Sequence, residues 1–228
     1  LGGHSPVMVF EDCDIEAAAK LCAAGKFRNA GQVCISPTRF FVQDKIHDKF
    51  LALFKEQVEA VKVGDGLSEG VNMGPLVAER RIEIMDGFVS DAVSNGAELL
   101  IGGSRIQSAG SFFAPTLLQE VPDTARIMTE EPFGPIAPTA RFSSLEEVIH
   151  LANSLPFGLA AYAFTGSAKT AGVLKQEIEA GMLAINSMHV HSVETPFGGL
   201  KFSGYGHEGG VEGLEVFLAT RYSSEIYG

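Results

Sequence analysis

The chain has 228 residues, of which 46% are hydrophobic and 20% are charged, so it has a globular composition and can bury a large core. Its 17 Lys and Arg residues against 28 Asp and Glu residues give a formal net charge of −11. This charge disfavours nucleic acid and membrane surfaces as partners and favours a small molecule or a protein, and no apolar run is long enough to span a membrane.

Patterns typical of strands and helices alternate along the chain. Apolar residues at helical spacing predict amphipathic helices, and short apolar runs between turn residues predict strands. In chain order we predict a strand at 6–10, a helix at 14–27, a strand at 39–42, helices at 45–61 and 79–94, a strand at 97–101, an extended segment at 112–121, a helix at 145–154, a strand at 160–165, a helix at 169–180, and strands at 182–186 and 219–227. This alternation favours an α/β fold with a mainly parallel sheet flanked by helices, whose ligands usually bind at the carboxyl ends of the strands.

Cys34 lies between a predicted helix and a predicted strand, three residues after Gly31. The backbone N–H groups at such a junction can lower a thiol's pKa and stabilise an oxyanion, so Cys34 is a candidate nucleophile. The alternative is a core cysteine, which is the commoner role of a lone thiol. Candidates for an activating base, as in the Cys/His hydrolases, are His189, His191 and His207.

The three cysteines are odd in number and form no C-x-x-C pattern. Neither a disulfide framework nor a metal site is therefore predicted. A reducing cytoplasm is the expected location.

Residues 129–135, Thr-Glu-Glu-Pro-Phe-Gly-Pro, combine two carboxylates, an aromatic ring and two prolines. The pattern suits a rigid turn with solvated charges. Alternatively, a carboxylate placed here accepts the hydroxyl groups of a ribose while the ring packs near a flat cofactor. The chain has no G-x-G-x-x-G or Walker pattern, so no phosphate-binding loop is predicted.

Four segments in this order resemble the aldehyde dehydrogenase superfamily over essentially the whole chain. Residues 1–6 resemble the end of its E-L-G-G-K-S-P motif, 31–34 its nucleophile motif, 130–135 its cofactor motif and 196–204 its late signature. The resemblance implies that a cysteine attacks an aldehyde, that hydride passes to NAD or NADP, and that water releases the acid from a thioester.

The resemblance also implies roles for individual residues. Cys34 would be the nucleophile, and its backbone N–H would form half of the oxyanion hole. Glu131 would hold the nicotinamide ribose and Phe133 would pack near the nicotinamide, with Leu1 and Gly2 bordering the cofactor.

For the substrate, Arg28 matches an arginine that binds the distal carboxylate in the succinic-semialdehyde branch, and a cation there suits an acidic aldehyde. Ser192 and the residues after it resemble the same branch. However, His191 replaces the serine expected just before it, and Ser36 stands where the branch often has a second cysteine. Phe197 matches an aromatic residue of the substrate funnel.

At the domain level, the resemblance implies a catalytic domain at 1–206, followed at 207–228 by a C-terminal helix and an oligomerisation arm. The strand at 219–227 would join a sheet in a homo-oligomer, a dimer or a tetramer. The family's N-terminal cofactor-binding domain and its general-base glutamate are missing from this chain, so we expect the chain alone to be inactive. A Cys/His hydrolase or acyl transferase, and a non-catalytic paralogue, are the alternatives.

Overall fold

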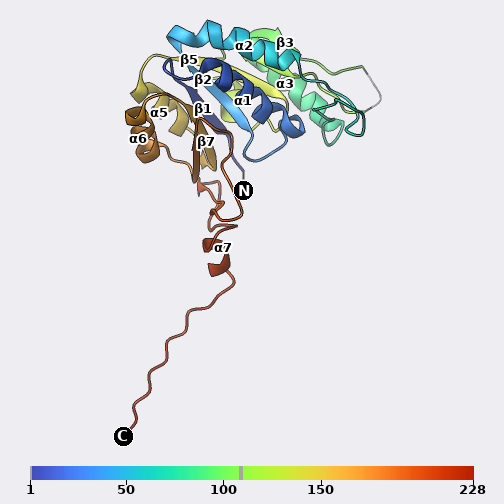
Figure 1. The fold of residues 1–228 in the computed structure, drawn as a ribbon. Helices are drawn as coiled ribbons and strands as arrows, with labels where there is room; N and C mark the ends of the chain where they lie inside the picture. The colour runs from blue at the N-terminus through green and yellow to red at the C-terminus, as the bar shows by residue number, and fades with distance from the viewer. Residues whose placement is uncertain (1, 108–109) are drawn as a thin grey trace.

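The computed structural model describes residues 2–107 and 110–228 and has a seven-stranded sheet with helices on both faces (Figure 1). The strand order is β3-β4-β5-β2-β1-β7-β8, and each neighbouring pair is parallel except β3 with β4. The strands are β1 (Ser5–Val9), β2 (Pro37–Gln43), β3 (Glu98–Ile101), β4 (Thr116–Gln119), β5 (Ile136–Phe142), β7 (Ala160–Phe164) and β8 (Met182–Ile185), and an antiparallel pair is formed by β6 (Phe157–Gly158) and β9 (Leu200–Lys201). The predicted α/β fold with a mainly parallel sheet is confirmed.

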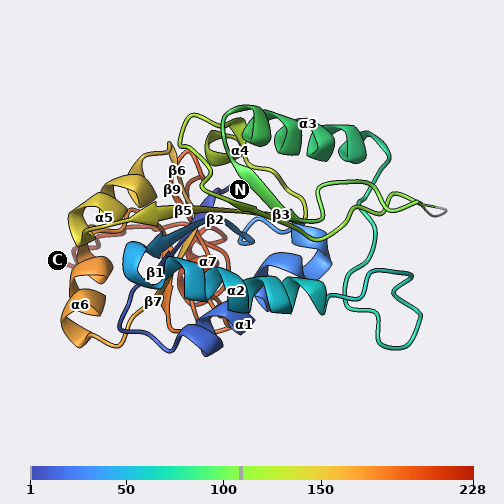
Figure 2. The same cartoon turned by 90° about the horizontal axis from the view of Figure 1, so that it is seen from above.

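Figure 2 shows α1 and α2 on one face of the sheet and α3 and α5 on the other. The α-helices are α1 (Ile15–Phe27), α2 (His47–Glu59), α3 (Arg80–Ser94), α4 (Arg126–Thr129), α5 (Leu145–Asn153), α6 (Ala168–Glu177) and α7 (Glu212–Glu215), and the short 3₁₀ helices are η1 (Arg28–Gly31) and η2 (Asp44–Ile46). None of the helices in the described ranges is long and apolar enough to cross a membrane.

Local capping signals set the helix ends. The side chain of Asp14 accepts a hydrogen bond from the N–H of Ala17 at 3.0 Å, so α1 begins where the sequence predicts. Helix α3 ends at Ser94, two residues before Gly96, whose φ of 103° lies in the region that glycine adopts at little cost. Both predicted helices are confirmed.

The core lies where aromatic side chains join the sheet to α2. The ring centroid of Phe54 lies 5.2 Å from that of Phe40 in β2 and 5.3 Å from that of Phe50, and all three side chains are fully buried. Strands β1 and β7 are buried along their whole length, as expected for parallel strands covered on both faces.

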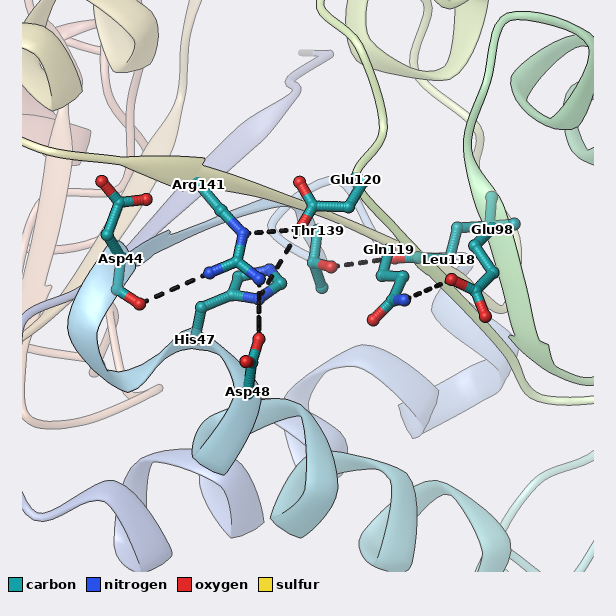
Figure 3. Close-up of polar contacts among 9 residues, drawn as sticks. All are labelled: Asp44, His47, Asp48, Glu98, Leu118, Gln119, Glu120, Thr139 and Arg141. Carbon is teal, nitrogen blue, oxygen red and sulfur yellow. Dashed lines mark hydrogen bonds and ion pairs between the residues drawn. The ribbon is translucent and has the colours of Figure 1, made fainter.

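Strand β5 lies near the middle of the sheet, contains Pro138 and was not among the predicted elements. Proline lacks a backbone N–H and normally argues against a central strand. In this sheet the hydroxyl of Thr139 donates to the carbonyl of Leu118 in β4 at 2.9 Å (Figure 3), which adds a side-chain bond beside the proline.

The predicted strand at 219–227 is wrong for this chain. The segment after α7 is an extended trace that leaves the folded body (Figure 1), and it forms no strand. A strand is stable only when it pairs with another, and no neighbouring strand in the described part of the chain reaches it. Its large apolar side chains remain exposed, among them Phe217, Ile226 and Tyr227.

Candidate functional site

Cys34 lies in a turn that joins η1 to β2 and is half-buried. Three successive residues before it, Asn29, Ala30 and Gly31, have φ angles of 50°, 53° and 69°, in the left-handed region. Non-glycine residues adopt this region at a cost, and such strain tends to collect at functional sites. The backbone thus turns sharply just ahead of the thiol.

Side-chain hydrogen bonds hold this turn in place. Gln32 accepts a hydrogen bond from the N–H of Val77 at 2.8 Å and donates to the carbonyl of Asn29 at 3.1 Å. The backbone N–H of Cys34 donates to no acceptor within residues 2–107 and 110–228. If the Cys34 thiol attacks a carbonyl carbon, the oxyanion that forms on it needs a hydrogen-bond donor, and this free N–H can be that donor.

The turn contacts two other segments that the sequence singles out. A Cβ at Gly31 would lie only 2.2 Å from the carbonyl oxygen of Gly134, so only glycine fits at position 31. A Cβ at Gly3 would lie 3.0 Å from the carbonyl oxygen of Cys34. The three segments meet because each precedes one of the adjacent strands β1, β2 and β5.

The candidate residues Gly2, Cys34 and Glu131 therefore lie at the amino ends of these strands, whereas the fold class alone predicts ligands at the carboxyl ends. That expectation describes open α/β sheets in which the loops after the strands bind the ligand. Here the loops before β1, β2 and β5 carry the chemistry-bearing side chains.

Glu131 lies beside the first residues of the chain, with its Oε2 atom 3.8 Å from where a Cβ of Gly2 would be. Leu1 lies outside the described residues. Burial raises the pKa of the Glu131 carboxyl, and this is opposed by the nearby N–H of Gly3 and the charge of Lys26. The structure thus brings Glu131 and Gly2 together at the edge of the turn that contains Cys34.

The backbone after Glu131 is held by helix α3. The guanidinium of Arg81 donates to the carbonyl of Pro132, and to that of Phe133 at 3.2 Å. Phe133 is half-buried and has a φ of 43°, a further strained residue at this site. Two carbonyls fixed by one guanidinium give the neighbouring carboxylate a defined position.

Lys26, at the end of α1, is the residue that sequence reasoning missed. It is fully buried, and its Nζ atom has no hydrogen-bond partner in the part of the chain that the structure describes. Nζ lies 3.2 Å from where a Cβ of Gly31 would be, next to the turn that contains Cys34. Burial lowers the pKa of Lys26 to about 7, and the Glu131 carboxylate opposes this shift. Lys26 follows Cys22 by one helical turn and so lies on the same buried face of α1, and this spacing is the signal that could have revealed it.

A cavity of about 320 Å³ opens beside the turn and is lined by Val33 and Ile35, the neighbours of Cys34. Arg28 also lines it, as do His189 and His191 from the loop after β8. This loop runs back along α1, because Met188 lies 3.3 Å from the Cβ position of Gly25. Arg28, which the sequence predicts to bind an anion, therefore lies in the same cavity wall as the two neighbours of Cys34.

Two other predicted substrate residues do not line the cavity. The N–H of Ser192 donates to the hydroxyl of Thr195 at 2.8 Å within a local turn. Phe197 packs edge-on against the ring of His191 at 5.9 Å. Neither Ser192 nor Phe197 is among the residues that line the cavity, whereas Ser36 is.

The hydrolase alternative needs a histidine bonded to the thiol. Among the described residues, no hydrogen bond joins the Cys34 sulfur to any histidine. His207 lies elsewhere, against Gly198, where a Cβ would come within 2.5 Å of its ring. Nothing in this geometry favours a Cys/His pair.

The fold and site define an α/β protein with a cysteine at the amino edge of its sheet, next to a half-buried carboxylate and an arginine-containing cavity. Residues 1–222 match the aldehyde dehydrogenase family, and the chain belongs to that family. The predicted membership is confirmed.

The similar proteins are named after different substrates. The 4-(hydroxymethyl)benzenesulfonate dehydrogenase TsaD1 of Comamonas testosteroni is 46% identical over 222 residues, which are 97% of this chain and 46% of that protein. The NADP(+) succinate-semialdehyde dehydrogenase GabD of Escherichia coli K12 is 39% identical over 97% of this chain and 46% of its own length. The crystal structure of succinate-semialdehyde dehydrogenase from Burkholderia pseudomallei superposes with a TM-score of 0.93 at 39% identity, covering 94% of this chain and 45% of that one. This chain thus spans just under half the length of the relatives that it matches.

Proposed function

We propose that the protein containing this chain oxidises an aldehyde to a carboxylic acid with NAD or NADP, through a covalent intermediate on Cys34. The observation that carries the proposal is the fixed turn of Cys34, whose free backbone N–H lies beside the thiol. The thiolate would attack the carbonyl carbon, and the resulting oxyanion would accept a hydrogen bond from that N–H. Bound NAD or NADP would supply the hydride acceptor, the resulting thioester would be held on Cys34, and water would release the acid and restore the thiol.

The cofactor would be held at one end by Glu131. Its half-buried carboxylate faces Gly2, which has no side chain to keep a ribose away, and its position is fixed through Arg81. A carboxylate that accepts both ribose hydroxyls suits either NAD or NADP, and relatives of both kinds match this chain. Phe133, two residues after Glu131, would pack near the nicotinamide, and Leu1, which lies outside the described residues, would border the cofactor.

The substrate would be an acidic aldehyde, such as succinic semialdehyde. Arg28 lines the cavity next to Val33 and Ile35, so a distal anionic group could pair with its guanidinium while the carbonyl reaches Cys34. The relatives named above act on a semialdehyde carboxylate and a benzenesulfonate, both of which carry an anion. Phe197 would support the cavity through its contact with His191, and Ser192 would shape the loop that follows His191.

We propose further that the activity belongs to the full-length protein and that this chain alone is inactive, because the family's general-base glutamate and adenosine-binding residues are not in it. Residues 207–228 would form the arm of a homo-oligomer, a dimer or a tetramer, and the exposed apolar side chains of Phe217 and Tyr227 support this. The three free cysteines fit a cytoplasmic location.

The substrate assignment is tested with Arg28→Ala in the full-length protein. The KM for succinic semialdehyde should rise by roughly tenfold or more, and that for a neutral aldehyde such as propanal by less than about threefold. Equal increases for both aldehydes would contradict the role of Arg28. No reduction of either cofactor by any aldehyde, with Cys34 still reactive toward iodoacetamide, would favour a non-catalytic paralogue.

A further inference from the structure

Lys26 differs from the other charged residues of α1 in its burial. Glu16 and Lys20 are exposed, whereas Lys26 is fully buried, and its Nζ atom has no hydrogen-bond partner within the described residues. A buried ammonium group without a partner costs free energy, because it loses its bonds to water and gains none in return. Packing alone therefore does not account for an amine at this position.

The amine of Lys26 lies close to two of the loops that carry candidate site residues. Its Nζ atom is 3.2 Å from where a Cβ of Gly31 would be, and the carbonyl oxygen of Gly134 is in contact with that same position. Gly31 precedes Cys34 by three residues, and Gly134 follows Glu131 by three residues. Lys26 is thus next to both the turn that contains Cys34 and the segment that contains Glu131.

Two titratable side chains face Lys26 from the neighbouring loops. His4 has hydrogen-bond partners on both ring nitrogens, and burial, together with the charges of Arg39 and Lys26, holds its pKa well below the usual value. His4 is therefore neutral and does not balance the amine. Burial lowers the pKa of Lys26 to about 7, and the carboxylate of Glu131 opposes this shift. Glu131 is thus the anion that acts on Lys26.

The two adjacent carboxylates, Glu130 and Glu131, have different surroundings. Glu130 is exposed, and Arg126 donates to both of its oxygens at 2.9 Å. Glu131 is half-buried, and no side chain in the described part of the protein donates a hydrogen bond to it. Arg81 also lies near Glu131, but its guanidinium donates to two backbone carbonyls. The amine of Lys26 has no such bond, so its charge is available to Glu131.

We propose that Lys26 is a positioning residue for the cofactor, whose buried charge keeps the Glu131 carboxylate ionised and facing Gly2, where it can accept the hydroxyl groups of a ribose. The inference rests on the proposed function of Glu131 and adds a residue that acts through it. Lys26 is not among the residues that line the cavity beside Cys34, so it is not a contact for the aldehyde. The stability lost by burying the amine is consistent with a functional role.

The proposal predicts a particular dependence on pH. With a pKa of about 7, the amine of Lys26 is mostly charged at pH 6 and neutral at pH 9. Burial raises the pKa of Glu131, and the N–H of Gly3 and the charges of Lys26, of Arg81 and of the chain's amino terminus oppose this. Without the Lys26 charge, the carboxyl of Glu131 would take up a proton more readily at pH 6, whereas at pH 9 it stays ionised in either case.

The test is a calorimetric titration of the full-length protein with NAD and with NADP in the absence of aldehyde. For the cofactor that binds more tightly, Lys26→Met should raise the Kd roughly fivefold at pH 6 and less than about twofold at pH 9. Lys20→Met is the matched control, because it makes the same substitution at an exposed position of the same helix. It should leave the Kd unchanged at both pH values.

A double-variant cycle with Glu131→Gln separates the charge of Lys26 from a packing role. Glutamine cannot take up a proton in this pH range, so Lys26 has no carboxylate to act on in this background. Glu131→Gln alone should raise the Kd roughly tenfold, and the addition of Lys26→Met should then change it less than about twofold at pH 6.

The outcomes separate this inference from the proposed function. Equal increases of the Kd at pH 6 and pH 9, additive effects of the two substitutions, or an unchanged Kd in Lys26→Met would each overturn the role of Lys26 and leave the cofactor site intact. An unchanged Kd in Glu131→Gln, or no binding of either cofactor by the parent protein, would contradict the proposed function and the inference with it.

Discussion

The two edges of the central sheet differ in how their charged side chains are satisfied. At the carboxyl edge, Arg141 bonds to Glu120 and to Asp48, and the Nδ1 atom of His47 lies 3.2 Å from Asp48 (Figure 3). These hydrogen bonds hold the pKa of Asp48 below its usual value. The cluster ties the ends of β4 and β5 to the start of α2. Its ion-paired side chains, Arg141, Glu120 and Asp48, are partly to largely exposed, whereas His47 is fully buried and its Nε2 atom has no partner among the described residues.

The amino edge has the opposite character. Lys26 is fully buried without a partner in the described residues, burial raises the pKa of Glu131, and several residues near Cys34 have strained backbones. Such features cost stability and persist where they serve a function. Exposed ion pairs thus tie the carboxyl edge together, whereas the amino edge holds a buried cation, Lys26, that has no hydrogen-bond partner among the described residues.

Removing the thiol should have the largest effect. In the full-length protein, Cys34→Ala should lower kcat/KM by roughly a thousandfold or more, because no other group can form the covalent intermediate. The melting temperature should change little, since Cys34 is only half-buried. Steady-state assays and thermal unfolding measure the two quantities. Cys13→Ala, which removes another half-buried thiol, is the control, and an active Cys34→Ala variant would refute the role of this residue.

Gly31→Ala should destabilise the chain by roughly 3 kcal/mol or more, because the new Cβ would clash with the carbonyl of Gly134 and the φ of 69° disfavours alanine. Gly96→Ala is the matched control. It has a positive φ of 103° but no atom within 4 Å of the added Cβ, so it should cost only about 1 kcal/mol. Urea unfolding of both variants measures the difference. Equal losses would show that the close approach of the two loops is not a constraint.

Lys26→Met should stabilise the chain at low pH. The folded-state pKa of about 7 lies below the usual value near 10.5, so the unfolded chain binds more protons between these pH values and the stability of the parent chain rises as pH increases. The variant lacks this burial cost and should gain on the order of 2 kcal/mol at pH 6, and less at pH 9. Urea unfolding at both pH values measures the gain, with exposed Lys20→Met as control. A loss of stability at pH 6 would mean that the Lys26 amine has a partner.

The smallest effect should come from the carboxyl edge. Arg141→Ala removes bonds to exposed carboxylates, and such pairs contribute little because water and salt screen them. The melting temperature should fall by less than about 5 °C, and the kcat/KM of the full-length protein should not change. A large loss of activity in this variant would show that the two edges are coupled and would break the distinction between them.

Much of the fold is encoded locally. The capped helices α1 and α3 and the buried strands β1 and β2 follow from residue spacing and from end signals such as Asp14. Strand β5 was missed, and its own Pro138 argues against a central strand; its place in the sheet comes from pairing with both β2 and β4. The strand predicted at 219–227 does not form, because local β propensity does not supply a second strand to pair with.

The candidate site, too, could be predicted from the sequence only in part. Cys34 and Glu131 stand out in the sequence, but their meeting at the amino edge depends on the adjacency of β1, β2 and β5, which is set by long-range pairing. The position of Lys26 beneath Gly31 depends on that same pairing. The placement of His189 and His191 in the cavity wall beside Arg28 depends on the loop after β8, which folds back onto α1.

The central claim is that Cys34 performs covalent aldehyde oxidation, and the most direct measurement is the absorbance at 340 nm of the full-length protein given NAD or NADP and an acidic aldehyde. The account predicts a steady rise with at least one of the cofactors, and no rise in Cys34→Ala. The same rise in Cys34→Ala, or none in the parent protein across carboxylate and sulfonate aldehydes, would contradict it.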